Sequence, residues 1–216
     1  MRIIKPSFSI EEEIDAKKIM SVIERAGRTC YKSESSISEE SADKFIANIL
    51  KRGHESVIEH EKITVRIICD RGVTHELVRH RIASFSQEST RYCNYSKDKF
   101  GGELTFIKPC FWDEETEDGK EKMKLWEESM AFIEKRYKKL IEIGAKPEEA
   151  RAILPNSLKT EIVVTMNLRE WRHFFKLRTA QAAHPQIREI AGAILKEFKD
   201  KLPAIFSDLY HNVSEV

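Results

Sequence analysis

Arginines are concentrated in one part of this sequence, next to histidine and hydroxyl side chains. Residues 63–96 contain five arginines and no lysine, whereas residues 97–146 contain ten lysines and one arginine. Arginine is favoured where a planar guanidinium must bind carboxylate or phosphate through two hydrogen bonds, while lysine acts as a hydrated point charge. The arginine-rich region is therefore a candidate anion site. The lysine-rich region is typical of a solvated helix surface.

The densest part of this region is the segment RHRIASFSQESTRY at residues 79–92. Its arginines and hydroxyls can donate hydrogen bonds to phosphate oxygens, and Phe85 or Tyr92 can stack on a ring. A polar surface turn with incidental positive charge is the simpler alternative.

A second basic cluster lies in residues 167–178, directly after a predicted strand. Asn167 can cap the helix or offer its amide to a ligand. Arg178 leads into the small residues Thr179–Ala183, which leave room for a ligand beside it. An ordinary amphipathic helix with a basic outer face explains the same pattern. Helical spacing places four side chains on that outer face: Arg169, Arg172, His173 and Lys176.

Neither a metal site nor a disulfide framework is indicated. Two histidines and two glutamates lie in Gly53–His60, but they form no HExxH motif or comparable pair of helical ligands. The four cysteines are 39, 24 and 17 residues apart and form no CxxC pair.

Composition excludes several classes of protein. The 216 residues carry a formal net charge of +1, which argues against a protein that coats nucleic acid. Apolar runs are much shorter than the roughly 20 residues of a membrane-spanning helix. The first residues reach Pro6 and then three glutamates without an apolar stretch, so no secretory signal is expected. We expect a cytoplasmic globular protein without a membrane span.

Residue periodicity predicts strands and helices without a βαβ rhythm. Alternating patterns predict strands over 2–10, 62–71, 103–108 and 160–166. Helical spacing predicts helices over 12–28, 74–81, 120–143, 147–154, 168–178 and 185–201, and a capping box at 36–39 predicts another that ends at Gly53. Residues 82–102 are expected to form an irregular loop, and residues 113–119 an acidic turn. We therefore expect an α+β fold, a single domain over residues 1–216 with an antiparallel-type sheet flanked by long helices.

Together, these motifs resemble the flavin-dependent thymidylate synthase family. Its hallmark, RHRxxSxxxxSxR, is matched without a gap by Arg79, His80, Arg81, Ser84, Ser89 and Arg91. Four companion motifs occur in the same order as in the family. They are GHES and IEH at 53–60, before the hallmark, and ARAxLP at 150–155, TxNLRxxxHF at 165–174, and LR and IR at 177–188 after it. The resemblance covers most of residues 25–190.

The resemblance implies methylation of dUMP to dTMP. Methylenetetrahydrofolate supplies the one-carbon unit, FAD carries the reducing hydride, and NADPH or a similar donor re-reduces the flavin. The partners would be these small molecules, not nucleic acid or a membrane. Family members are homotetramers whose sites draw on more than one chain.

The resemblance also implies roles for particular residues, and none of them is a metal ligand. Arg178 matches the catalytic arginine at the uracil edge, whose cation favours ionised N3 and a more nucleophilic C5. The positions implied to bind FAD are Ser56, Arg79, His80, Arg81, Gln87, Asn167, Leu168, Arg169 and His173. The positions implied to bind dUMP are Glu76, Leu77, Val78, Arg79, Gln87, Glu88, Ser89, Thr90, Arg91, Arg151 and Arg178.

This sequence departs from the family pattern at two places. Some members carry Gln where this chain has Glu76, and the residues Ala182, Ala183 and His184 replace a His-Ala-Gln segment, so His184 is left without a role. Ser89 has no evident general base, so no covalent nucleophile is assigned. Two alternatives stay open: a flavin-independent nucleotide-binding transferase, and an RNA-binding module that uses arginine and aromatic residues.

Overall fold

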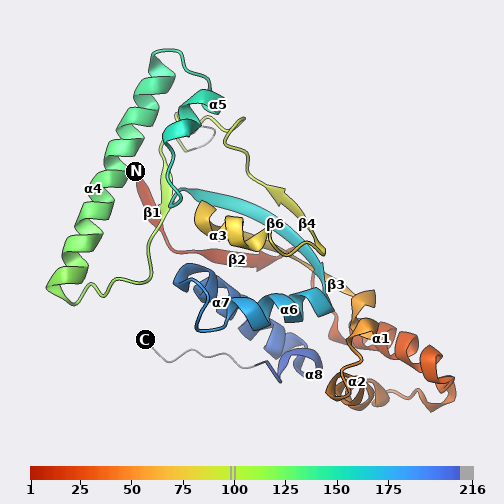
Figure 1. Ribbon diagram of the computed structural model, residues 1–216. Coiled ribbons are helices and arrows are strands. Elements are labelled where there is room, and N and C mark those ends of the chain that lie inside the picture. Colours follow the sequence, from red (N-terminus) through yellow and green to blue (C-terminus); the bar gives the residue numbers. More distant parts are fainter. Residues whose placement is uncertain (98, 100, 210–216) are drawn as a thin grey trace. The chain divides into compact units, whose positions relative to one another are not determined.

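The computed structural model describes residues 1–97, 99 and 101–209 and has the predicted α+β composition (Figure 1). The strands are β1 (Arg2–Ile4), β2 (Ser7–Ile10), β3 (Lys62–Asp70), β4 (Ala83–Gln87), β5 (Thr105–Ile107) and β6 (Lys159–Asn167). The helices are α1 (Ala16–Tyr31), α2 (Ser41–Lys51), α3 (Arg71–Leu77), α4 (Glu117–Glu142), α5 (Pro147–Ala150), α6 (Leu168–Arg178), α7 (Pro185–Lys201) and α8 (Pro203–Phe206). Short 3₁₀ turns lie at Glu34–Ser36, Glu55–His60 and Arg151–Ile153.

The strands form two sheets. A four-stranded antiparallel sheet has the order β2-β3-β6-β4, which confirms the predicted sheet type. A separate pair joins β1 to β5 in parallel, with Arg2 opposite Thr105 and Ile4 opposite Ile107. In β3 and β6 the side chains alternate between buried and partly exposed, because successive residues of a strand point to opposite faces.

The chain divides into two compact units, each described by itself below. Unit 1 contains residues 1–7, 67–79 and 86–162, and unit 2 contains residues 8–66, 80–85 and the chain from residue 163 onward. The single-domain organisation over residues 1–216 stays a prediction. Within the described part of the chain, no helix combines the length and apolar character that crossing a membrane requires.

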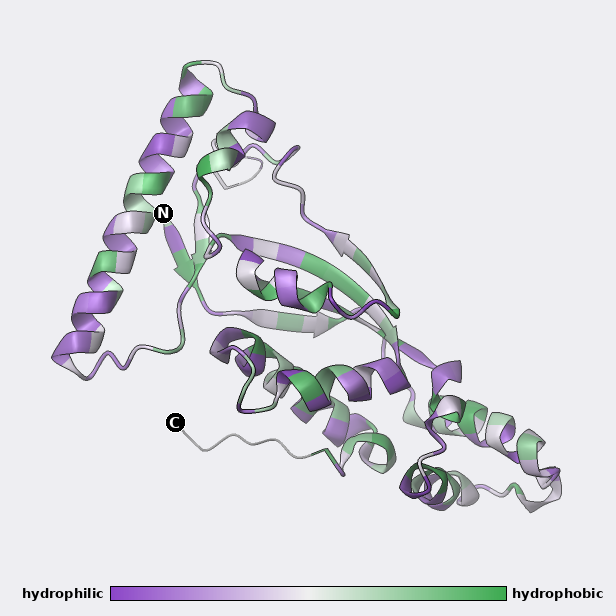
Figure 2. Ribbon diagram, viewed as in Figure 1, coloured by the Kyte–Doolittle hydropathy of each residue, from purple (hydrophilic) through white to green (hydrophobic). Residues whose placement is uncertain are grey.

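The core of unit 1 forms along one face of α4. This helix carries many hydrophilic residues interrupted by hydrophobic ones (Figure 2), and the hydrophobic ones recur at helical spacing. Met123, Trp126, Met130 and Tyr137 are buried and pack with residues of β5 and its surroundings. Thr116 caps the helix by accepting a hydrogen bond from the backbone N–H of Gly119 at 3.0 Å. The predicted apolar stripe is therefore the face that α4 buries.

The core of unit 2 is aromatic and lies where α6, α7 and α8 meet. Trp171 and Phe175 of α6 have ring centroids 5.6 Å apart, and Phe198 of α7 is 5.4 Å from Phe175. The Trp171 indole N–H donates to the carbonyl oxygen of Ile63 in β3 at 3.0 Å, which satisfies its polar atom inside the core. This packing fixes α6, the helix that carries most of the second basic cluster.

Several predicted boundaries were wrong for identifiable reasons. The strand expected over residues 2–10 is interrupted near Pro6, which has no N–H to donate, and its halves β1 and β2 belong to different sheets. The capping box at 36–39 does not form, because α2 begins at Ser41, whose hydroxyl accepts from the N–H of Ser38 instead. The acidic turn at 113–119 passes into α4 at Glu117, and α8 was not predicted.

The hallmark segment is more regular than expected. The helix predicted over 74–81 is α3 at 71–77, which starts earlier because the Asp70 carboxylate caps the backbone N–H of Val73 at 2.7 Å. The loop predicted over 82–102 contains β4, an edge strand beside β6. Consequently the first arginines of the hallmark connect a helix to a strand, and the last one follows that strand.

Candidate functional site

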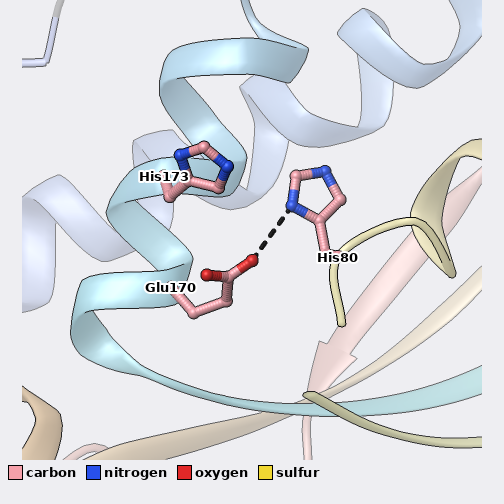
Figure 3. Close-up of side chains that lie close together, drawn as sticks. All are labelled: His80, Glu170 and His173. Atoms are coloured by element: carbon pink, nitrogen blue, oxygen red, sulfur yellow. Dashed lines mark hydrogen bonds and ion pairs between the residues drawn. The ribbon is translucent and has the colours of Figure 1, made fainter. Parts of the chain in front are cut away.

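A buried histidine links two charged side chains in unit 2. His80 is only 4% exposed, and its Nδ1 lies 3.2 Å from Oε1 of Glu170 (Figure 3). On the other side of the ring, Nε of Arg178 donates a hydrogen bond to His80 Nε2 at 3.1 Å. Both partners come from α6, whose first turn is fixed because the Asn167 side chain accepts from the backbone N–H of Glu170 at 2.8 Å.

These contacts determine the protonation of His80. Because Nε2 accepts a hydrogen bond from Arg178, the ring proton must lie on Nδ1, where it is donated to Glu170. Burial lowers the pKa of His80 below its ordinary value, the hydrogen bond to Glu170 opposes that effect, and the Arg178 and His173 charges add to it. At neutral pH His80 is therefore an uncharged imidazole with a defined tautomer.

The same cluster has the residue types of a metal site. His80, Glu170 and His173 each offer a ligand atom, and these atoms lie within 4.8 Å of one another. However, both nitrogens of His80 already take part in hydrogen bonds, and the Arg178 cation adjoins the ring. A divalent cation would have to break these bonds beside a positive charge, so we propose no metal here.

Arg172 contradicts the prediction of a basic outer face on α6. Its side chain is 3% exposed and forms two 2.6 Å hydrogen bonds with the carboxylate of Asp208, and it also contacts Glu55 at 3.3 Å. The carbonyl oxygen of Ile205 accepts from the same guanidinium. Arg172 therefore ties α6 to the 3₁₀ turn at Glu55–His60 and to the segment after α8, which is a structural role.

This ion pair predicts a pH dependence of stability. The Arg172 guanidinium lowers the pKa of Asp208 below its ordinary value of 3.8. The stabilisation is therefore complete above the ordinary pKa and is lost as pH falls through the lower, native pKa. We expect Asp208→Asn to lower the free energy of unfolding at pH 7, but only modestly, because the Asp208 side chain is 61% exposed. At pH 2 the substitution should have much less effect.

Urea denaturation at both pH values measures this effect. Asp200→Asn, an exposed carboxylate of α7, is the matched control and should differ little from wild type at either pH. An Asp208→Asn variant as stable as wild type at pH 7 would contradict the assignment.

Arg169 and Lys176 of α6 are exposed and paired with carboxylates. Arg169 contacts Glu59 at 2.5 Å and Glu55 at 3.8 Å, and Lys176 contacts Glu55 at 3.3 Å. His173 is exposed, and its ring centroid lies 5.7 Å from that of His80. Of the residues of α6 that the resemblance implies to contact the flavin, Arg169 and His173 are exposed and Leu168 is buried.

In unit 1, the end of β4 and the segment after it are held by internal hydrogen bonds. The Gln87 amide donates to the hydroxyls of Thr74 at 3.1 Å and Thr160 at 3.2 Å. The Glu88 carboxylate accepts from the Tyr95 hydroxyl at 2.6 Å and pairs with Lys159 at 2.7 Å. The side chains of Gln87 and Glu88 are thus used to fix the segment.

The turn after Glu88 contains Ser89, Thr90 and Arg91, which are predicted to bind the nucleotide, and Arg151 lies close to it. The N–H groups of Tyr92 and Cys93 donate to the carbonyl oxygen of Ser89, which closes the turn. Arg151 Nη1 donates to the Thr90 hydroxyl at 3.5 Å, so Arg151 reaches the turn from a distant motif. Arg91 is exposed and lies 4.0 Å from Glu148.

The other predicted residues are distributed as follows. Val78 and Arg79 are exposed at the end of α3, Glu76 is partly buried there, and Ser56 and Arg81 are exposed in unit 2. Leu77 and Leu168 are buried core residues, 1% and 0% exposed, so any ligand contact from them would come from the backbone. Sequence reasoning missed Glu170, Tyr95 and Lys159. Only Glu170 had a signal, because it lies one helical turn before His173.

Most dUMP positions lie in unit 1 and most FAD positions in unit 2. Unit 1 contains Glu76, Leu77, Val78, Arg79, Gln87, Glu88, Ser89, Thr90, Arg91 and Arg151, and unit 2 contains Ser56, His80, Arg81, Asn167, Leu168, Arg169, His173 and Arg178. The assignment of these residues to ligands stays a prediction.

Comparison with known proteins gives one consistent family. The family described as "Thymidylate synthase complementing protein" matches residues 14–204. A flavin-dependent thymidylate synthase of Pyrococcus furiosus is 42% identical over 79% of this chain and 68% of its own length. The protein of the same name from Pyrococcus abyssi is 42% identical over 74% of this chain and 64% of its length. The protein of the same name from Geobacter sulfurreducens is 36% identical over 85% of this chain and 78% of its own length.

The chain thus spans about two thirds of the length of the two Pyrococcus relatives. The family match nevertheless covers most of the chain, including all the motifs that build the two clusters. This chain is therefore an enzyme of the flavin-dependent thymidylate synthase family.

Proposed function

We propose that this enzyme methylates dUMP to dTMP, with methylenetetrahydrofolate as the one-carbon donor, FAD as the hydride carrier and NADPH as the reductant of the flavin. The observation that carries the proposal is the turn at Ser89–Arg91, where hydroxyls and arginines from two distant motifs come together. Such a set can bind a phosphate through charge-assisted hydrogen bonds. A phosphate monoester is the group by which dUMP differs from its nucleoside.

In this proposal, the turn binds the dUMP phosphate. The Ser89 hydroxyl is held in place because it accepts from the N–H of Arg91 at 3.3 Å. Arg91 and Arg151 supply guanidinium groups, and Thr90 links the turn to Arg151. The internal bonds of Gln87 and Glu88 keep this arrangement formed before the nucleotide arrives, which lowers the entropy cost of binding.

The exposed cations of unit 2 fit a cofactor that carries a pyrophosphate. Arg81 and Arg169 are exposed, and His173 lies one turn after Arg169 on α6. The Asn167 oxygen is used to cap α6, which leaves its NH₂ group as the donor for a ligand. FAD, when bound, supplies the hydride chemistry, and these side chains would orient it. Binding would require Arg169 to exchange Glu59 for the pyrophosphate.

Arg178 supplies the charge at the reacting base. A guanidinium beside the uracil edge stabilises the N3-deprotonated form, and the additional electron density makes C5 a better nucleophile toward the one-carbon unit. No nucleophile from the protein is needed for this step. In the same proposal the enzyme is a cytoplasmic homotetramer whose sites are shared between chains.

The first test is a visible absorption spectrum after the protein is incubated with FAD and the excess is removed. We expect a retained oxidised-flavin spectrum that changes when dUMP is added, and dTMP formation once methylenetetrahydrofolate and NADPH are supplied. A colourless protein that still binds dUMP would favour the flavin-independent transferase. Salt-sensitive RNA binding without dUMP binding would favour the RNA-binding alternative.

Ser89→Ala tests whether a serine nucleophile is required. We expect measurable turnover with a raised KM for dUMP, because the hydroxyl accepts from the N–H of Arg91 and would contact phosphate but would form no bond to carbon. Loss of a hydrogen bond to a charged phosphate, about 1.5–3 kcal/mol, corresponds to a change in KM of about 10–10²-fold. Steady-state kinetics and dUMP titration measure the effect. A variant that binds dUMP normally but forms no dTMP would overturn this prediction.

A further inference from the structure

We propose that Glu170 and His80 are positioning residues that hold the guanidinium of Arg178 through a chain of hydrogen bonds. This inference deepens the proposed function, on which it rests for the role of Arg178. Glu170 lies between matched positions of its motif, and neither the sequence nor the resemblance gave it a role.

Each of the three residues linked by these hydrogen bonds has one role in holding the guanidinium. Glu170 accepts the Nδ1 proton of His80 at 3.2 Å, which fixes the tautomer, and the bare Nε2 then accepts Nε–H of Arg178 at 3.1 Å. Glu170 and His80 are 8% and 4% exposed, so water competes little for these bonds. The Nε atom belongs to the rigid guanidinium plane, and its hydrogen bond therefore limits rotation of the whole group.

The imidazole is also held from its sides. The Phe174 ring lies 5.1 Å from the His80 ring in an edge-to-face arrangement, and the His173 ring lies at 5.7 Å. Among the described residues, Glu170, His173 and Arg178 of α6 are the charged or titratable groups that act on His80. Arg79 and Arg81 adjoin it in the chain but have exposed side chains. His80 thus has a fixed ring plane and a fixed tautomer.

A chain of this kind has a pH-dependent consequence. When His80 gains a proton, Nε2 becomes a donor and can no longer accept from Arg178. The imidazolium and the guanidinium would also repel each other. Acidification should therefore release Arg178 and lower kcat/KM for dUMP. The Glu170 anion favours the protonated ring, so it moves this loss to higher pH.

The test compares Glu170→Ala, Glu170→Gln and His80→Gln in the flavin-loaded enzyme. We expect Glu170→Ala to lower kcat by about 10²-fold, the cost of a misplaced reacting group, with flavin binding retained. Glu170→Gln keeps an oxygen that accepts from Nδ1–H, so its loss should be smaller. It should also shift the acid limb of the pH profile to lower pH, because the anion that favours protonated His80 is gone.

His80→Gln provides a rescue that a merely structural role does not explain. Its amide oxygen can accept from Arg178 without titrating, so we expect a retained part of the activity and no acid limb from this residue. The double variant with Glu170→Ala should then match His80→Gln alone, because the two positions act through one bond. Glu24→Gln is the control for loss of a buried carboxylate, since Glu24 is 2% exposed in α1 and pairs with Arg28.

Two readouts separate failure of this inference from failure of the proposed function. If wild type forms dTMP and Glu170→Ala behaves like Glu24→Gln, or if the double variant loses the product of the two single losses, the positioning role is wrong. If wild type forms no dTMP, the ¹⁵N shifts of His80 still decide the matter. An Nε2 shift that moves toward that of an imidazole nitrogen without a donor in Glu170→Ala shows that Arg178 is no longer held and supports the proposal, and an Nε2 shift unchanged by the variant overturns it.

Discussion

Arg178→Ala is expected to lower kcat for dTMP formation by about 10²–10³-fold, the effect of removing one group that stabilises developing charge. The guanidinium lies at the end of α6 and donates to His80, which orients it before any ligand binds, and the proposed function places it beside the base. Arg178→Lys should recover only part of the loss. A lysine keeps the charge, but it has no planar fork and cannot donate to His80 Nε2 while it contacts the base in the same plane.

Single-turnover measurement of flavin oxidation with saturating dUMP and methylenetetrahydrofolate checks this prediction, because it separates chemistry from binding. Arg25→Ala is the matched control, since Arg25 is an exposed arginine of α1 in the same unit. A rate in Arg178→Ala within a few fold of the control would show that this charge does not assist the reaction.

Elements with strong periodicity could be predicted from the sequence. β3, β6, α4, α6 and α7 lie within about three residues of their predicted limits, because each has a clear apolar face to bury. β4 was missed because its residues, ASFSQ, are mostly small and polar, and none of its side chains is fully buried. Its strand conformation depends on pairing with β6, whose first residue lies 72 positions after the last residue of β4. Local residue preferences do not encode such a pairing.

The side chains of the candidate site also divide into those that the sequence predicted and those that only the structure reveals. The motifs identified the arginines and hydroxyls that gather at the Ser89–Arg91 turn. They did not identify the groups that hold them, because those contacts join residues far apart in sequence, such as His80 and Glu170 at a separation of 90. Arg172 shows the opposite error. Helical spacing placed it with exposed cations, yet Glu55 and Asp208, 117 and 36 residues away, draw it into the interior.

Glu88→Ala is expected to weaken dUMP binding by about 10–10²-fold while flavin binding is retained. The reason is indirect, since the Glu88 carboxylate is occupied by Tyr95 and Lys159 inside unit 1. Burial, and then the hydrogen bond to Glu88, raise the pKa of Tyr95, so its hydroxyl remains a donor at every working pH. Without the carboxylate, the buried Tyr95 hydroxyl loses its acceptor and the Lys159 ammonium is left with Glu161 at 3.8 Å, at about 1.5–3 kcal/mol for a bond to a charged group.

Calorimetric titration with dUMP and urea denaturation of a small set of variants test this account. Glu88→Gln should lose less than Glu88→Ala, because its amide oxygen still accepts from Tyr95, and Tyr95→Phe should lose least, because the pair with Lys159 is kept. Glu127→Ala, an exposed carboxylate of α4, is the control. Equal losses in Glu88→Ala and Glu88→Gln would instead indicate that dUMP contacts the carboxylate itself. In that case Glu88 would have to exchange Tyr95 and Lys159 for the nucleotide when dUMP binds, and the turn at Ser89–Arg91 would lose these two supports in the complex.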